Sequence, residues 1–300
     1  MSKVCIVDFS QTVIVACAVQ MKEIKDSDVD LKPLVKHVAF TMLLNIKKKF
    51  GSRIILACDS KNGYWRKDEY QYYKGHRKHE NTEFLNWTLV HETINELKQE
   101  IREHFSYVLL EVDGAEADDV IAVLCKYYQD NELSDGTLFS EPLDIIIVSN
   151  DKDFQQLQKY SNVEQWNNIE KKFILCDDPK KFLEEHIAIG DSGDNIPSIT
   201  TDDTWSELRA KGISTRAKNF KKTRIEEFRN NSIEACLDDN EKRNWHRNKK
   251  LIDFESIPEH INNRIISSYQ NYEIKGNRNK VYNYLIKNKM KVLLGSIQDF

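Results

Sequence analysis

Short hydrophobic runs recur along the first half of the chain and predict its strands. They cover residues 3–7, 53–58, 107–112 and 143–149, and Val, Ile and Leu dominate them. Their apolar residues follow one another without the alternation of a half-exposed strand. Such runs are typical of parallel strands that are buried on both faces of a sheet.

The segments between these runs have the spacing of amphipathic helices. In residues 33–50 apolar side chains return every three or four positions, and Pro33 suits a first helical turn. Residues 83–104 and 117–129 also have helical patterns. This order of strands and helices predicts an α/β fold, with a mostly parallel central sheet flanked by helices and joined by right-handed crossovers.

The pattern changes after residue 178, because no further strand-like runs follow. Charged helical stretches take their place at 181–188, 204–230, 233–250 and 258–272. We therefore expect an α/β domain over residues 1–178 and a smaller helical C-terminal part over residues 179–300.

Residues 61–82 differ from both parts, because they are rich in bases and tyrosines and their apolar residues have no clear period. This segment is predicted to be a loop or a mobile arch. Aromatic rings that stack on bases, together with cations that hold phosphates, are typical of single-stranded nucleic-acid binding. The residues that would supply them are Tyr64, Trp65, Arg66, Lys67, Tyr73, Lys74 and Arg77. The alternative is a hairpin or helix that buries some of these rings in the core.

The composition is that of a globular protein. The chain has 300 residues, of which 40% are hydrophobic and 31% charged. Its apolar runs fit neither a signal peptide nor a membrane span, so a cytoplasmic protein without membrane contact is expected. Six cysteines form no CxxC pair and are expected to be buried thiols. The net charge of −4 does not itself favour a nucleic-acid partner, but bases are locally concentrated.

Acidic residues gather where the predicted strands end. Asp8, Asp59 and Asp151 closely follow strands, and the carboxyl ends of parallel strands meet at one edge of a sheet. Each acid alone is explained equally well as a turn or cap residue. Taken together they indicate a site, and the candidate metal ligands are Asp8, Asp59, Glu116, Asp118, Asp119, Asp151, Asp153, Asp191 and Asp194.

Such a cluster has a chemical rationale. Carboxylates that lie close together raise one another's pKa unless cations separate them. A set of acids with no His or Cys nearby favours hard divalent ions, Mg²⁺ or Mn²⁺. Two such ions about 4 Å apart can activate a water and stabilise the leaving oxygen of a phosphodiester. The sequence therefore predicts a phosphodiester-cleaving site with two Mg²⁺ ions, for which Mn²⁺ can substitute.

Several motifs together resemble the flap endonuclease and 5′-nuclease family, in particular its branch of T-even phage ribonucleases H. The similar stretches are VDFSQT, NGYWRKDEYQYYKGHR, EADDVIAVL, SNDKDFQQLQKY, GDSGDNI and KKLIDFESIPEHI. They extend through nearly the whole chain. The resemblance implies a PIN-like sheet, with residues 61–82 forming an arch or bridge over the site.

The resemblance also implies an activity. It points to a 5′→3′ exonuclease and flap endonuclease that removes RNA primers and adjacent DNA during lagging-strand replication. Its substrates would be flap, nicked or gapped DNA and RNA–DNA hybrids with a 5′ end. A monomer in the cytoplasm of an infected bacterium is implied, with a single-stranded-DNA-binding protein and a sliding clamp as partners.

Matching motifs assign roles to individual residues. The first metal would lie among Asp8, Asp59, Glu116, Asp118 and Asp151, and the second among Asp153, Asp191 and Asp194. Asp119 would be a ligand or would support one. The residues implied in catalysis are Asp8, Asp59, Asp118, Asp151, Lys74 and Arg66.

The chain departs from the wider family after GDSGDN. It lacks the GIG turn of the hairpin that grips duplex and can hold potassium, so the resemblance does not extend to a potassium site. Duplex contacts are expected instead from the bases Lys211, Arg216, Lys218, Lys221 and Lys222.

Two other interpretations remain open. A haloacid-dehalogenase-like phosphatase would explain Asp8 and the GDSGD stretch, but such enzymes have a second Asp where this chain has Ser10. A non-catalytic, metal-stabilised nucleic-acid-binding module would bind nucleic acid without Mg²⁺-dependent cleavage.

Overall fold

The structure is a computed structural model of the chain. It describes residues 3–23, 30–51, 53–79, 86–131, 143–218, 220–221, 223–224 and 236–300. Within these ranges, no helix is both long enough and apolar enough to cross a membrane.

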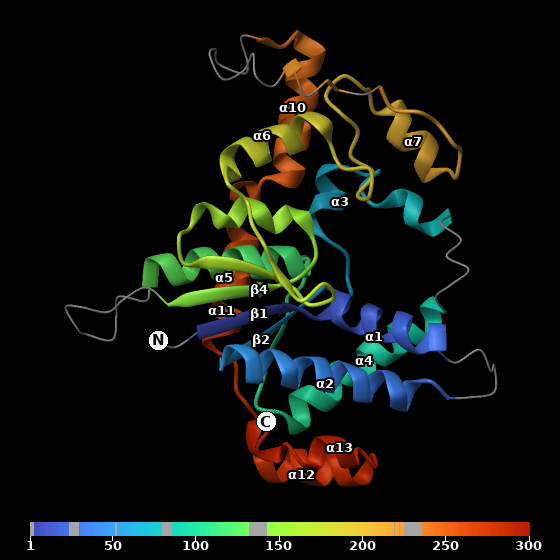
Figure 1. Cartoon of the computed structure of the whole chain (residues 1–300). Helices are drawn as coiled ribbons and strands as arrows, with labels where there is room; N and C mark the ends of the chain where they lie inside the picture. The colour runs from blue at the N-terminus through green and yellow to red at the C-terminus, as the bar shows by residue number, and fades with distance from the viewer. Residues whose placement is uncertain are drawn as a thin grey trace.

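A six-stranded sheet forms the centre of the molecule (Figure 1). Its strands lie in the order β3-β2-β1-β4-β5-β6, and all neighbours are parallel except β5 and β6. This confirms the mostly parallel sheet and the four predicted strands. The bounds are β1 Lys3–Asp8, β2 Arg53–Cys58, β3 Val108–Glu111, β4 Asp144–Val148, β5 Val163–Asn167 and β6 Lys172–Ile174.

The hydrophobic pattern of the sequence did not predict the strands β5 and β6. In β5 the sequence VEQWN places a fully buried polar residue, Gln165, between its apolar ones. The Gln165 amide donates to the backbone oxygens of Ser149 at 3.0 Å and Asp151 at 2.6 Å. A polar side chain in this strand therefore fixes the chain that leaves β4.

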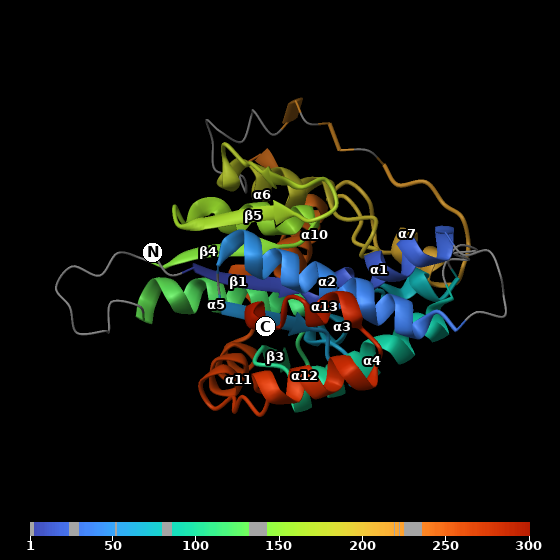
Figure 2. The same ribbon diagram turned by 60° about the horizontal axis from the view of Figure 1, so that its bottom comes forward.

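Helices cover both faces of the sheet (Figure 2). Cys5 and Val7 of β1 belong to a core shared with the helices α1, α2 and α4, whereas Val4 and Ile6 face α5 and α11. Successive residues of a strand point to opposite faces, so a strand buried on both faces needs the continuous apolar run that the sequence has. The bounds are α1 Phe9–Glu23, α2 Lys32–Phe50, α4 Trp87–His104, α5 Ala117–Asn131 and α11 Glu259–Gln270.

The predicted helices match the observed ones with one main exception. Within the predicted stretch 204–230, helix α7 covers only Thr204–Ala210, and residues 213–218 form neither helix nor strand. Part of the remaining stretch lies outside the described residues. In the predicted stretch 233–250, the described helix α10 (Asp239–Ile252) begins at a capping box formed by Asp238 and Glu241.

The C-terminal part packs against the sheet domain. Ile261 and Ile265 of α11 are buried in the same core as α5. Val281 and Leu285 of α12 (Arg278–Lys287) join the core of α2 and α4, as does Leu293 of α13 (Lys291–Leu294). A boundary at residue 178 stays a prediction, since these helices share both cores of the sheet.

The segment that follows β2 is more ordered than its sequence pattern indicates. It forms α3 (Trp65–Glu69) and the 3₁₀ helix η1 (Gly75–His79), while residues 80–82 lie outside the described part. Tyr70 and Tyr73 are buried in a third core, together with side chains of α6 (Pro179–Ile189) and α10. This core joins the segment to the C-terminal part.

Candidate functional site

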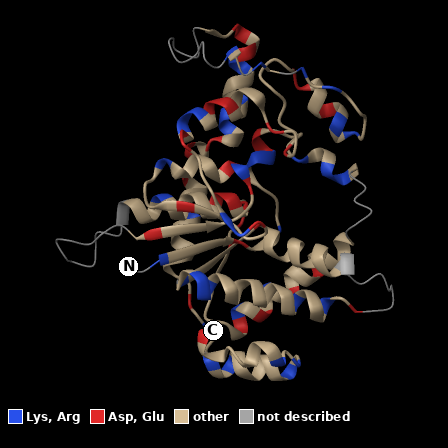
Figure 3. Cartoon of the chain, viewed as in Figure 1, with Lys and Arg blue, Asp and Glu red and all other residues tan. Residues whose placement is uncertain are grey.

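Three predicted acids lie at one edge of the sheet. Asp8 is the last residue of β1, Asp59 directly follows β2, and Asp151 lies three residues beyond β4. The parallel register aligns Val7 with Leu56 and Val148, so the three strands end at the same level. Figure 3 shows acidic residues at this edge, facing α3 and α6.

Asp8 and Asp59 are held by the elements that begin beside them. Asp8 is 9% exposed and its Oδ1 accepts the Gln11 N–H at 3.0 Å. The Ser10 hydroxyl donates to Asp59 Oδ2 at 2.9 Å, and the Ala117 N–H donates to Asp59 Oδ1 at 3.1 Å. The starts of α1 and α5 therefore fix these two carboxylates.

Asp8 and Asp118, in this acidic cluster, hold their protons unusually tightly. Burial, reinforced by the charges of Asp59 and Asp151, raises the pKa of Asp8 to about 7. Burial and the charges of Asp151 and Asp8 also raise the pKa of Asp118 well above its usual value. Carboxylates this close repel one another unless cations lie between them. The residues therefore fit a divalent cation with oxygen ligands.

Glu116 has a different environment, because protein cations surround it. It is 1% exposed, and its carboxylate contacts Arg66 Nη1 at 2.8 Å and Lys74 Nζ at 2.5 Å, and accepts the Tyr73 hydroxyl at 2.9 Å. Burial opposes ionisation, but Lys74 and Arg66 outweigh it and hold the pKa of Glu116 below its usual value. Glu116 is therefore a member of the cluster that is ionised at neutral pH.

Asp119 lies behind this group and is fully buried. Its Oδ2 accepts the Trp65 indole N–H at 3.0 Å and the Glu116 N–H at 2.9 Å, and Arg66 Nη1 lies 2.8 Å from its Oδ1. Protein groups contact both of its oxygens. This environment fits the second of the two roles that the resemblance implied for Asp119, the support of a ligand.

The structure corrects the expectation that Trp65, Arg66 and Tyr73 contact nucleic acid. Their exposed fractions are 5%, 3% and 2%. Arg66 Nε donates to the Leu251 oxygen at 2.8 Å, which attaches α3 to the end of α10. Trp65 and Tyr73 instead follow the alternative, in which aromatic rings are buried in the core. Their polar atoms donate hydrogen bonds to the carboxylates.

Of the seven residues of this segment that were expected to bind nucleic acid, four reach the surface at least partly: Lys74, Arg77, Lys67 and Tyr64. Lys74 has a left-handed backbone (φ 53°), and its N–H donates to the Asp194 oxygen at 2.9 Å. Burial lowers the pKa of Lys74, but Glu116 and Asp194 more than compensate and raise it. Arg77 Nη2 contacts Asp194 Oδ1 at 2.9 Å. Both side chains are thus cationic beside the acids.

The GDSGDN turn follows α6 and depends on its first glycine. Gly190 has φ 75°, and a Cβ there would lie 2.5 Å from the backbone oxygens of Ile196 and Pro197. Asn195 is fully buried, and its amide donates to the Tyr72 and Ser206 oxygens at 2.9 Å. The turn is therefore anchored both to the segment after β2 and to α7.

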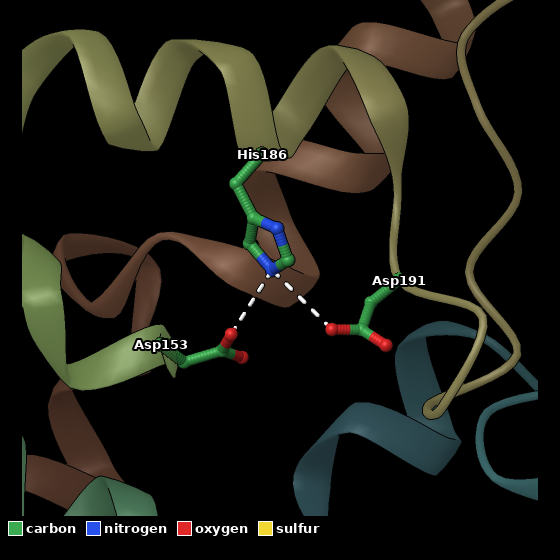
Figure 4. Close-up of side chains that lie close together, drawn as sticks. All are labelled: Asp153, His186 and Asp191. Atoms are coloured by element: carbon green, nitrogen blue, oxygen red, sulfur yellow. Dashed lines mark ion pairs between the residues drawn. The ribbon is translucent and has the colours of Figure 1, made fainter. Parts of the chain in front are cut away.

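A histidine that the sequence analysis missed lies between two predicted metal ligands (Figure 4). His186 Nε2 is 3.0 Å from Asp153 Oδ1 and 3.4 Å from Asp191 Oδ2, and the three residues could hold a metal ion. The expectation of an acid cluster without histidine is therefore wrong. The sequence shows that His186 lies in the last turns of a predicted helix, five residues before Asp191, but it does not show the contact with Asp153.

The bases expected to contact duplex are on the surface. Lys211, Arg216, Lys218 and Lys221 are exposed, and Lys222 lies outside the described residues. Lys211 Nζ pairs with Glu207 Oε1 at 2.5 Å one turn earlier in the chain. Their role in binding stays a prediction.

Two family models together match almost the whole chain. The 5′-3′ exonuclease N-terminal resolvase-like domain matches residues 4–186, and the C-terminal domain of T4 RNase H matches residues 180–300. These matches exclude a haloacid-dehalogenase-like enzyme. The place of that family's second Asp is taken by Ser10, whose hydroxyl donates to Asp59.

Individual relatives agree with these models. Ribonuclease H of Enterobacteria phage T4 is 30% identical over 99% of this chain and 95% of its own. The flap endonuclease Xni of Shewanella denitrificans is 31% identical over 58% of this chain and 64% of its own. A phage T5 flap endonuclease structure with DNA and metal ions has the same fold, with a TM-score of 0.60, 15% identity, and 89% of this chain and 98% of that chain covered. The chain therefore belongs to the 5′-3′ exonuclease and flap endonuclease family, in the branch of T4 ribonuclease H.

Proposed function

We propose that this nuclease uses two Mg²⁺ ions to hydrolyse phosphodiester bonds at 5′ flaps, nicks and gaps and in RNA–DNA hybrids with a 5′ end. Its role would be the removal of RNA primers and adjacent DNA during lagging-strand replication. The observation that carries the proposal is the buried edge of the sheet, where burial and neighbouring carboxylates raise the pKa values of Asp8, Asp118 and Asp151 while Lys74 stays charged beside them.

The acids would divide between two ions. Asp8, Asp59, Asp118 and Asp151 would hold one, and Asp153, Asp191 and Asp194 the other, with Glu116 orienting Lys74 toward the site. Bound divalent ions would activate a water and stabilise the leaving oxygen. Mn²⁺ would substitute for Mg²⁺, since both accept carboxylate oxygens.

The cations beside the acids would act on the phosphate. Lys74 is 14% exposed at its side chain and is held by Glu116, so little reorganisation is needed when charge develops on the phosphate. Arg77 is 53% exposed and can contact the strand that enters the site. Lys67 and Tyr64 lie in the same segment and would contact the 5′ single strand.

The exposed bases Lys211, Arg216, Lys218 and Lys221 would contact duplex phosphates at a distance from the cut. We also propose that the protein acts as a monomer in the cytoplasm of an infected bacterium. A single-stranded-DNA-binding protein and a sliding clamp would be its partners.

The proposal is tested with 5′-labelled flap, nicked and RNA-primed substrates, each incubated with and without Mg²⁺. Cleavage near the 5′ end is expected in Mg²⁺ and no cleavage in excess chelator. Binding without Mg²⁺-dependent cleavage would instead support a non-catalytic binding module. Undiminished cleavage in chelator would contradict the metal mechanism.

A further inference from the structure

His186 brings a nitrogen atom to a cluster that otherwise consists of carboxylates. The residue is 6% exposed, and its ring stacks on Phe182 one turn earlier in α6, with the ring centroids 5.7 Å apart and the planes 14° apart. Nε2 points toward the carboxylates of Asp153 and Asp191 (Figure 4). Packing therefore fixes the direction in which this nitrogen points.

The distances around Nε2 are those of ligands that share one ion. Nε2 is 3.0 Å from Asp153 Oδ1 and 3.4 Å from Asp191 Oδ2. Two ligand atoms that each lie about 2.1 Å from an ion are about 3.0 Å apart at a right angle and about 3.4 Å apart at the tetrahedral angle. The three ligand atoms all lie within 4.8 Å of one another, so they can approach one such cation together.

An ion pair is one account of this arrangement, since His186 Nε2 lies 3.0 Å from Asp153 Oδ1 and the two attract each other when the ring is protonated. Within the described part of the chain, neither His186 Nε2 nor Asp153 Oδ1 has a hydrogen-bond partner, although both are buried. Buried polar atoms are rarely left without a partner. A cation between the two atoms would satisfy both.

We propose that His186 Nε2 is a direct ligand of the divalent ion held by Asp153 and Asp191. This ion position is then a mixed nitrogen and oxygen site. Imidazole favours transition ions such as Zn²⁺, whereas Mg²⁺ favours oxygen ligands, so this position should prefer Zn²⁺ or Mn²⁺ to Mg²⁺. The inference rests on the proposed function for the second ion position, and it adds the ligand that sets metal preference there.

Lys152 competes with an ion at this position. Its Nζ lies 2.9 Å from Asp191 Oδ2, and its side chain is 52% exposed. The half-exposed Lys152 side chain can turn into solvent, where its ammonium group stays hydrated, whereas Asp191 is only 12% exposed. The geometry therefore allows the ion to replace the Lys152 ammonium group.

The test is spectroscopic and does not use cleavage. Mn²⁺ is bound to the wild-type protein, and the electron spin echo is examined for coupling to a directly bound ¹⁴N nucleus. Coupling is expected in the wild type and should be lost in His186→Gln and His186→Lys. Zn²⁺ affinity measured by calorimetry should fall about tenfold or more in both variants, since even residues that only orient a ligand contribute about 10–100-fold. Mg²⁺ affinity should change much less.

The two variants and a control separate the proposal from an ion pair. His186→Lys keeps a positive charge beside Asp153 and Asp191, so it is expected to fold even where His186→Gln does not. If His186 acts only as a cation, His186→Lys keeps the wild-type Zn²⁺ affinity, and the proposal is overturned. His260, which is exposed on α11, gives the matched control His260→Gln, which should retain the ¹⁴N coupling.

Two further outcomes distinguish this inference from the proposed nuclease function. Wild-type protein that cleaves with Mg²⁺ but shows no ¹⁴N coupling overturns the inference alone. Coupling that disappears in the His186 variants, in a protein that cleaves no substrate, supports the inference and contradicts the nuclease function.

Discussion

Asp8→Asn should stabilise the metal-free protein at pH 8, although it removes a proposed metal ligand. Asp8 is 9% exposed, and burial raises its pKa from 3.8 to about 7 with further contributions from Asp59 and Asp151. A tenfold change in proton affinity corresponds to about 1.4 kcal/mol, so ionising Asp8 in the folded protein costs about 4 kcal/mol. Asparagine is neutral, and its oxygen can still accept the Gln11 N–H.

The sign of the pH dependence follows from proton binding. Between pH 3.8 and about 7 the folded state binds the Asp8 proton more tightly than the unfolded state does. The contribution of Asp8 to the stability of the metal-free wild type therefore falls as pH rises through this window. The variant lacks this contribution, so the two proteins should have similar stability near pH 4. By pH 8 the variant should be more stable by about 2–4 kcal/mol, the lower value allowing for relaxation of the site.

The assay is equilibrium unfolding in denaturant at pH 4 and pH 8, in excess chelator and again in Mg²⁺. The exposed acid Asp177 provides the control Asp177→Asn, which should behave as wild type at both pH values. Mg²⁺ should stabilise the wild type more than Asp8→Asn, because it binds the folded carboxylates. If Asp8→Asn in chelator at pH 8 is no more stable than wild type, the argument from buried charge is refuted.

Four further predictions concern cleavage and substrate binding. Asp151→Asn should abolish cutting while substrate binding is kept or strengthened, because a negative charge facing a polyanion is lost; a variant that cuts a flap substrate within a few-fold of wild type would contradict this role. Lys74→Ala should lower the single-turnover rate about ten- to a thousandfold, as expected for a preorganised charge. Lys221→Ala should instead weaken substrate binding and reduce the salt slope of the binding affinity by about one, while the cleavage rate at saturation stays unchanged. A Lys74→Ala effect on affinity alone, or an unchanged salt slope in Lys221→Ala, would show that the assignment is wrong. Ca²⁺ should bind without supporting turnover, since its looser geometry positions the substrate poorly; equal rates in Ca²⁺ and Mg²⁺ would argue against a strict geometry.

Much of the fold and of the acid cluster could be predicted from the sequence, because each depends on local patterns. Continuous apolar runs identify β1 to β4, and parallel strands place their carboxyl ends at one edge. Asp8, Asp59 and Asp151 could therefore be brought together without a structure. The short strand β5 could not, since its buried Gln165 interrupts the apolar pattern that marks a strand.

Only the tertiary structure decided which polar side chains near the acids are exposed and which are paired with an acid. Trp65, Arg66 and Tyr73 lie in a stretch that is typical of nucleic-acid binding, yet all three are buried against Glu116 or Asp119. Arg66 also bonds the oxygen of Leu251, 185 residues away in the sequence. Local periodicity reports how a segment folds on itself, but not which distant partner will neutralise its side chains. The same limit hid His186, whose nitrogen meets Asp153 only after α6 packs against the chain that follows β4.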